Sequence, residues 1–207
     1  KLVVSNIQQE TFYHTDQVFS GDYTVEMRAR VNNQAVGLLL GQGGNNAAMW
    51  SLATVNPLGV WVHPMNNWAG VVKVPFDQVQ NGRWVTLKVA IQGTTATTYL
   101  NDQQVHQYTV PEGSTNGSIG LRFSTTESAD LDYLKVYQDG KTIWEDGFNK
   151  IDSNKWDFPA PQSGTTGDGR VWIDNGQLVV PGGGDVTYTS KQNFSGDYTI
   201  EMKATVH

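Results

Sequence analysis

The residues best suited to chemistry in this sequence lie in one short segment, 59–68, which combines aromatic, amide and imidazole side chains. Two valines alternate there with Trp61 and His63. If the valines face a core, Trp61 and His63 point together off the opposite face of the same strand. An aromatic ring offers a flat apolar face to the C–H side of a sugar ring, and an imidazole hydrogen-bonds its hydroxyls. The segment therefore predicts one side of a sugar-binding site.

Three residues of the adjoining loop and one distant arginine would complete this site. Asn66, Asn67 and Trp68 follow directly in the sequence and supply two amides and a second ring. Arg122 stands opposite the apolar residues of the alternating segment 118–123, so it should also point away from the core. A structural interpretation stays open, in which the two tryptophans only cover the sheet and fill a loop.

Carboxylates placed for glycan cleavage are not evident in the sequence. Such cleavage takes two carboxylates that face one groove, about 5 Å apart in retaining enzymes and about 6.5–9.5 Å apart in inverting ones. The nearest candidates are Glu127, Asp130 and Asp132, but Glu127 is out of phase with the other two, and no third acid has strand spacing. We interpret Glu127 and Asp130 as loop residues and Asp132 as a partner of nearby backbone. No serine lies in a Gly-x-Ser-x-Gly motif, so we predict that the chain is not an enzyme.

The histidines do not predict a metal centre. The four of them, His14, His63, His106 and His207, show none of the short spacings that zinc sites use. A structural calcium ion is compatible with folds of this kind, but no run of oxygen ligands points to one. We therefore expect no metal ion and no cofactor.

Alternation of apolar and polar residues extends through most of the chain and is clearest in segments 22–31 and 84–91. Turn-forming Asn-Gly and Asp-Gly pairs separate the alternating segments, and no segment has a sustained helical stripe. Many short strands with frequent turns are typical of two packed sheets. The prediction is an all-β fold, an antiparallel two-sheet sandwich of the jelly-roll kind without substantial helix.

An internal repeat divides the chain. Segment 19–31 recurs as segment 194–206, and 10 of the 13 positions are identical. We therefore expect residues 1–140 to form the body of one sandwich repeat, and residues 141–207 to contain the opening strands of the next. Because 1–140 lacks its own opening strands, 141–207 is predicted to dock on the same or a neighbouring sandwich, with possible strand exchange with another copy.

Composition excludes several kinds of partner. The net charge is −6 and no basic stripe occurs, which argues against nucleic acid as a ligand. No apolar run approaches the ~18 residues of a membrane span, which argues against membrane insertion. The chain begins at Lys1 without a leader peptide, so we expect a mature or trimmed chain. Only 16% of residues are charged, and the uncharged polar surface together with seven tryptophans suits a neutral sugar.

The order of motifs within the repeat carries a family resemblance. Read from Trp144, the repeat shows in turn Glu145–Asn149, Trp156, 171–178, the Gly-Asp-Tyr-Thr strand, Gly82–Trp84, 117–122 and 132–136. This order resembles the concanavalin A-like, laminin G-like sandwich. It is especially similar to the sugar-binding domains appended to bacterial glycoside hydrolases, of the α-L-rhamnosidase- or levanase-associated type.

The resemblance implies a function and a location. It implies a non-catalytic carbohydrate-binding module from a larger secreted glycoside hydrolase or surface protein, with a polysaccharide or glycan as partner. It also implies a secreted or cell-surface location. Two alternatives stay open: a repeat of an adhesin or stalk that acts as a spacer or binds protein, and an enzyme with an unrecognised site.

Overall fold

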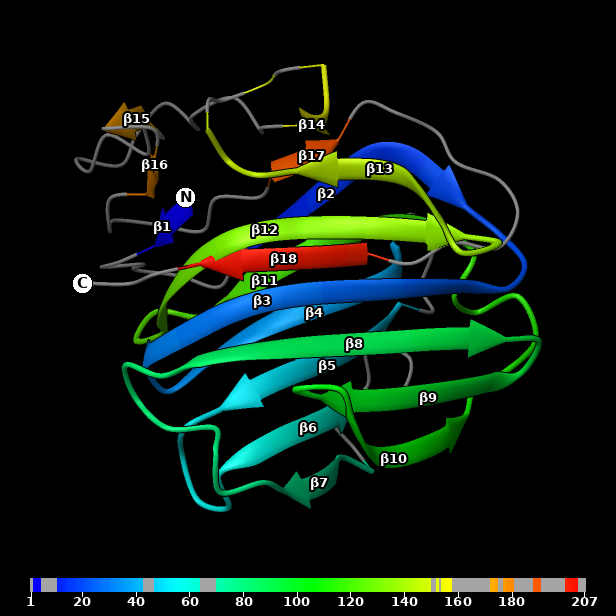
Figure 1. Cartoon of the computed structure of the whole chain (residues 1–207), viewed down its shortest axis with the longest axis horizontal. Coiled ribbons are helices and arrows are strands. Elements are labelled where there is room, and N and C mark those ends of the chain that lie inside the picture. Colours follow the sequence, from blue (N-terminus) through cyan, green and yellow to red (C-terminus); the bar gives the residue numbers. More distant parts are fainter. Residues whose placement is uncertain are drawn as a thin grey trace.

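The computed structural model describes residues 2–4, 11–42, 47–63, 70–149, 152, 154–157, 172–174, 177–180, 188–190 and 200–204 of the chain. Every regular element within these residues is a β-strand, and the strands form two sheets that lie face to face (Figure 1). The described part of the chain contains no helix long and apolar enough to cross a membrane. The predicted all-β, two-sheet sandwich is confirmed.

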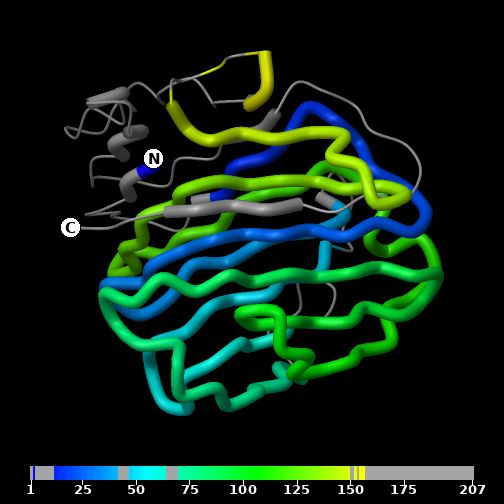
Figure 2. Tube along the Cα trace, viewed as in Figure 1, coloured from blue at the N-terminus to red at the C-terminus, as the bar shows by residue number. Residues whose placement is uncertain are grey.

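Sheet A lies in front in Figure 1 and contains, in spatial order, the strands β10 (Gln103–Thr109), β9 (Thr95–Leu100), β8 (Trp84–Gln92), β3 (Tyr23–Asn33), β12 (Ser128–Gln138), β1 (Leu2–Val4), β16 (Gln177–Val180) and β15 (Trp172–Asp174). Two further strands pair with β12, namely β13 (Lys141–Asp146) and β18 (Ile200–Ala204). Figure 2 shows that β3 lies between β8 and β12, which are far from it in the sequence.

Sheet B lies behind sheet A and contains, in spatial order, β14 (Trp156–Asp157), β17 (Tyr188–Ser190), β2 (Thr11–Phe19), β11 (Gly117–Phe123), β4 (Ala35–Gln42), β5 (Ala48–Ala53), β6 (Gly59–His63) and β7 (Val72–Pro75). Neighbouring strands of β4, β5, β6 and β7 are all antiparallel. Because side chains alternate along each strand, every strand of this sheet has one face toward sheet A and one face away from it. We call the second face the outer face of sheet B.

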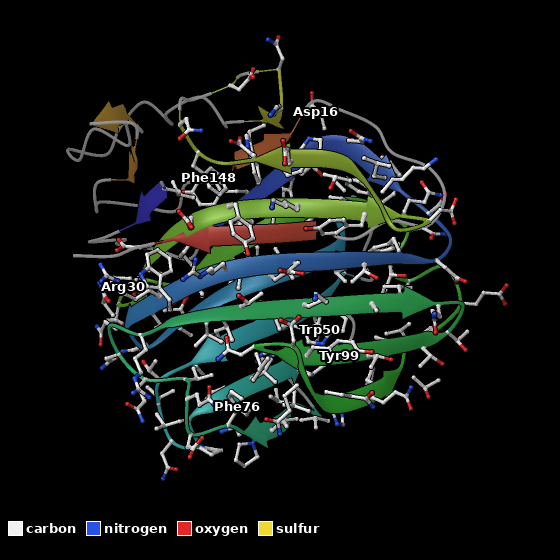
Figure 3. The ribbon with its side chains drawn as sticks, viewed as in Figure 1. Asp16, Arg30, Trp50, Phe76, Tyr99 and Phe148 are labelled. Carbon is white, nitrogen blue, oxygen red and sulfur yellow. The ribbon has the colours of Figure 1, made fainter. Side chains whose placement is uncertain are left out.

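The core fills the space between the sheets and explains the alternation in the sequence. On β3 the residues Tyr23, Val25 and Met27 are buried, while the residues between them are partly exposed. Trp50 of β5 is fully buried, and its Nε1 donates a hydrogen bond to the hydroxyl of Thr98 on β9 at 2.9 Å. Trp50 is labelled in Figure 3, and this bond links the two sheets through the core.

A hairpin-like segment after β12 completes the core with aromatic side chains. Trp144 on β13, Phe148 and Trp156 on β14 are all buried and belong to the main apolar cluster. The rings of Trp144 and Trp156 lie 5.4 Å apart edge to face, and Phe148 lies 5.8 Å from Trp156. The indole Nε1 of Trp156 donates to the carboxylate of Asp146 at 2.7 Å. These contacts join β13 and β14 to the same core as the strands before them.

The repeated strands meet the same partner strand. β18 pairs Met202 with Leu134 of β12, and β3 pairs Arg28 with Tyr133 of β12. Since Met202 is the repeat counterpart of Met27, both copies of the strand meet β12 in one register. The division into residues 1–140 and 141–207, and the exchange of strands between copies, stay predictions.

The acidic segment near residue 130 differs from the sequence interpretation. Glu127 lies in the turn before β12, as expected, but Asp130 lies within β12 rather than in a loop. Asp130 is fully buried and pairs with Arg30 at 2.6 Å, and Asp132 pairs with Arg28 at 3.7 Å. The loop interpretation of Asp130 was wrong because Asp130 falls at an outward position of β12, where an arginine of β3 neutralises it.

Candidate functional site

Strand register brings two of the predicted site residues into one row across the outer face of sheet B. Arg122 of β11 pairs with Gly37 of β4, Gly37 with Ser51 of β5, and Ser51 with Trp61 of β6. Trp61 in turn pairs with Lys73 of β7. Residues directly opposite each other in a sheet present their side chains on the same face. We call these five residues the Arg122–Lys73 row.

A second row lies next to the first and contains His63. Gly120 of β11 pairs with His14 and with Leu39, Leu39 pairs with Met49, and Met49 pairs with His63. Val62, the neighbour of His63 on β6, faces the core, so the His63 side chain shares the outer face with Trp61, as predicted. The outer face therefore carries two adjacent rows. In the second row, the apolar side chains of Leu39 and Met49 lie between the polar side chains of His14 and His63.

Two glycines let neighbouring side chains lie flat on this face. A Cβ at Gly37 would stand 2.8 Å from the Met49 sulfur and 3.2 Å from the Arg122 Cβ. A Cβ at Gly120 would stand 2.8 Å from the His14 Nδ1. Real Cβ contacts are not this short, so the side chains of Arg122, Met49 and His14 occupy the space above the two glycine positions.

Burial differs sharply along the row and corrects the picture of an open site. Arg122 and His63 point away from the core as predicted, yet they are only 8% and 4% exposed. Ser51 is also buried, whereas Trp61 is half-buried and Lys73 is exposed. An outward position in the alternating pattern therefore does not guarantee exposure. The accessible part of the Arg122–Lys73 row is the end formed by Trp61 and Lys73.

The predicted loop residues Asn66, Asn67 and Trp68 lie outside the residues that the structure describes. Their contribution to the site stays a prediction.

Arg122 is held in place by an acidic partner. Its Nη1 donates to the Oε1 of Glu127 at 2.7 Å, and both side chains are buried. The other carboxylate oxygen of Glu127 accepts a hydrogen bond from the backbone N–H of Ser124 at 2.7 Å. A carboxylate with both oxygens engaged in this way is a structural ion-pair partner, and it compensates the charge of Arg122 beneath the surface.

Both histidines of the outer face are neutral near pH 7. Burial lowers the pKa of His63 to about 4, with further contributions from the positive charges of Arg122 and Lys73. Burial alone lowers the pKa of His14 to about 3. Neutral imidazoles can hydrogen-bond other groups, but with pKa values this low they are weak bases.

Trp61 has a fixed indole with a cation on its ring. Its Nε1 donates to the backbone carbonyl of Pro57 at 2.9 Å, which fixes the orientation of the ring. The Nζ of Lys73 lies 3.8 Å from the ring centroid, within the range of a cation–π contact. Trp61 and Lys73 therefore act as one unit at the accessible end of the row.

The described residues contain no group of three or more His, Cys, Asp or Glu side chains that could hold a metal ion. The three carboxylates considered in the sequence analysis, Glu127, Asp130 and Asp132, do not form a pair on the outer face of sheet B. Glu127 pairs with Arg122, while the two aspartates lie on β12 of the other sheet and pair with arginines of β3.

Sequence reasoning missed three members of the row, Gly37, Ser51 and Lys73. The segment Val72–Pro75 alternates apolar and other residues, so Lys73 could have been assigned to an outward position. Its position beside Trp61 depends on the pairing of β6 with β7, which period-two alternation does not reveal. The hydroxyl oxygen of Ser51 is buried and has no hydrogen-bond partner among the described residues.

Comparison with known proteins gives one family match. The family model of the 3-keto-alpha-glucoside-1,2-lyase-like domain matches residues 2–136. A search of curated proteins found no match.

Solved structures with a related shape are distant in sequence. Carbohydrate binding module CBM66 from Bacillus subtilis is 15% identical with a TM-score of 0.46, over 58% of this chain and 78% of that chain. Sheep galectin-11 in complex with glycerol is 10% identical with a TM-score of 0.43, over 58% of this chain and 97% of that chain. Toad ovary galectin in complex with thio-digalactose is 10% identical with a TM-score of 0.44, over 59% of this chain and 98% of that chain.

Proposed function

We propose, from the premise that the chain belongs to the family of 3-keto-alpha-glucoside-1,2-lyase-like domains, that it is a non-catalytic carbohydrate-binding module. Its ligand is a polysaccharide or glycan, and its parent is a larger secreted glycoside hydrolase or surface protein. The observation that carries the proposal is the fixed, half-exposed indole of Trp61 at the accessible end of a polar row.

The binding mode follows from the chemistry of this end of the row. The apolar face of a sugar ring packs against an indole, while polar side chains beside it hydrogen-bond the hydroxyls. The hydrogen bond from Trp61 to the Pro57 carbonyl holds the ring in place before a ligand arrives, which lowers the entropy cost of binding. His63 and Arg122 lie beneath this surface and keep the neighbouring side chains in position.

The family's name suggests a second candidate function, elimination across C1–C2 of a 3-keto-glucoside. Such a reaction needs a base that removes the C2 proton beside the keto group. The histidines of the outer face, His14 and His63, have pKa values of about 3 and about 4 and are therefore poor bases. Glu127, the carboxylate beside Arg122, is already engaged in an ion pair with that arginine. These properties favour binding over catalysis.

The test of the binding proposal is a glycan array with the whole chain and two tryptophan variants. Trp61→Ala should lose most of the binding, because it removes the ring that packs on the sugar. Trp84→Ala is the matched control, since Trp84 is also half-buried but lies on sheet A between Arg28 and Arg30. Equal binding by the parent chain and Trp61→Ala would rule out this face as the site, and so would equal losses in the two variants.

The test of the catalytic alternative uses a 3-keto-glucoside as substrate. Elimination would conjugate a new C1=C2 bond with the C3 carbonyl, and this enone absorbs ultraviolet light. We expect no increase in absorbance above that of a heat-inactivated control. A steady increase that His63→Gln abolishes would establish the chain as an enzyme.

A chain that binds no glycan on the array would favour the remaining alternative, a spacer or protein-binding repeat of an adhesin or stalk. The proposed secreted or cell-surface location can be measured separately, by fractionating cells that produce the parent protein.

A further inference from the structure

The position of Lys73 points to the kind of sugar that this face accepts. Lys73 lies on β7, the edge strand of sheet B, directly opposite Trp61 of β6. Its ammonium group lies 3.8 Å from the centroid of the Trp61 ring. The cation thus occupies part of the surface on which a sugar ring would stack.

Lys73 also differs in its surroundings from the three arginines described above. Within the part of the chain that the structure describes, no carboxylate lies within ion-pair distance of Lys73. The other cations discussed above do have carboxylate partners, namely Arg28 with Asp132, Arg30 with Asp130 and Arg122 with Glu127. Lys73 is thus an exposed cation that lies on an aromatic ring.

Among the charged residues of the row, only Lys73 has a positive charge that no carboxylate of the described residues neutralises. Glu127 neutralises Arg122 at the buried end. His63 in the adjacent row carries no charge near pH 7, since burial and the two cations lower its pKa to about 4. A ligand that approaches Trp61 therefore meets one net positive charge, that of Lys73.

We propose that Lys73 makes this site selective for sugars that carry an anionic group, a carboxylate or a sulfate; this inference rests on the proposed function of the face. The sugar ring packs against Trp61, and its anionic group accepts hydrogen bonds from the Lys73 ammonium. The sequence alone favoured a neutral sugar, because the cation beside Trp61 is apparent only from the pairing of β6 with β7.

Competition between ligands explains the selectivity. A neutral sugar that takes the ring face displaces the ammonium, and the protein then loses the cation–π contact. An anionic sugar replaces that contact with a charge-assisted hydrogen bond, so the ammonium keeps a partner. Both ligands bury similar apolar area on Trp61, so the charge decides between them.

The experiment measures binding to charged and neutral forms of the same backbone by calorimetry. One arm compares polygalacturonate with its carboxyl-reduced counterpart, and the other compares dextran sulfate with dextran. Each pair is titrated at low and high salt with the whole chain, Lys73→Met and Lys73→Arg. Methionine keeps an apolar stem over Trp61 without the charge, and arginine keeps the charge. Lys141→Met is the control, because Lys141 is an exposed lysine of β13 on sheet A.

We expect the parent chain to bind a charged polymer more tightly than its neutral counterpart, with weaker binding at high salt. Lys73→Met should weaken binding of that polymer about fivefold and remove most of its salt dependence, the size expected for one exposed ion pair. Lys73→Arg and Lys141→Met should bind it as the parent chain does. Preferential binding of polygalacturonate would identify a carboxylate ligand, and preferential binding of dextran sulfate would identify a sulfate ligand.

Three results would overturn the inference. Equal affinity of the parent chain for both members of each pair would do so, and so would unchanged binding of the charged polymer by Lys73→Met. In either case, binding that Trp61→Ala abolishes on the glycan array would leave the proposed function intact. If the parent chain binds neither charged polymer, the inference fails. The proposed function fails with it only if the parent chain also binds no glycan on the array.

Discussion

Two glycines determine how the side chains of the outer face lie. Gly37 and Gly120 leave space that Arg122, Met49 and His14 occupy, and this arrangement buries Arg122 although it points away from the core. A glycine can therefore shape a site without any positive backbone φ, simply through the absence of a side chain. The spacing of residues in the sequence gives no sign of this, because it depends on which strands are neighbours.

Gly37→Ala should destabilise the chain by about 1–3 kcal/mol, the usual cost of overpacking. The added methyl would stand 2.8 Å from the Met49 sulfur and 3.2 Å from the Arg122 Cβ, so both side chains must move. Urea denaturation measures the loss. Gly147→Ala is the control, since the nearest atom there is a side-chain amide nitrogen at 3.3 Å. An equal effect of the two substitutions would show that the outer face is loosely packed.

The pKa of His63 makes stability depend on pH. The unfolded imidazole binds a proton below about pH 6.5, but the folded one does so only below about pH 4, so the unfolded state holds more protons between these values. The free energy of unfolding should therefore fall as the pH falls through this window. For one group the slope is at most about 1.4 kcal/mol per pH unit.

His63→Gln should reduce this pH dependence by the share of one group, as measured by urea denaturation at several pH values, and leave the share of His14, whose pKa is lowered in the same direction. The comparison must be made between variants, because burial raises the pKa of Asp146 and gives a contribution of opposite sign. Parallel curves for the parent chain and His63→Gln would contradict the lowered pKa of His63.

At the scale of elements, the segment formed by β13 and β14 is part of the core rather than an appendage. Trp144, Phe148 and Trp156 contact one another and belong to the main apolar cluster. The bond from Trp156 to Asp146 gives a buried carboxylate a donor. A sandwich body without this segment would expose a large apolar surface.

Trp156→Ala should cost about 3–5 kcal/mol of stability, because it removes a buried indole and leaves a cavity beside two aromatic rings. It also removes the donor to Asp146. Thermal unfolding followed by circular dichroism measures the change.

A chain that ends at residue 140 lacks all three rings and should be poorly soluble or unfolded. A cooperative unfolding transition of that fragment would contradict the role given to this segment.

The sequence predicted the elements well and the site only in part. Strict alternation in 22–31 and 84–91 corresponds to β3 and β8, because one face of each strand is buried against the other sheet. The same alternation correctly aimed Trp61, His63 and Arg122 off the core face. It could not give their exposure or the position of Lys73, because both depend on contacts between strands that are distant in sequence.

At the scale of the whole molecule, the chain has two copies of a strand and one partner strand for them. β3 and β18 both pair with β12 in the same register. If one copy occupies the place beside β12, the backbone N–H and C=O groups along the edge of the other copy lack a partner strand. Such an edge is the usual condition for pairing with another chain. We therefore keep strand exchange as a proposal for chains of this length.

The 207-residue chain should form oligomers whose fraction increases with protein concentration, as measured by light scattering after size-exclusion chromatography. A chain that ends at residue 157 keeps β3 and the aromatic rings of β13 and β14 but lacks β18, so it should be monomeric. Monomers of both chains at every concentration would argue against exchange.

The contact between Lys73 and Trp61 gives the chain an internal optical probe. The emission of an indole shifts with the electric field across its ring, and an ammonium group 3.8 Å from the centroid contributes strongly to that field. A ligand that moves the Lys73 ammonium off the ring, or neutralises its charge, shifts the emission maximum of Trp61. The change is isolated from the other six tryptophans by subtracting the spectra of Trp61→Phe with and without ligand.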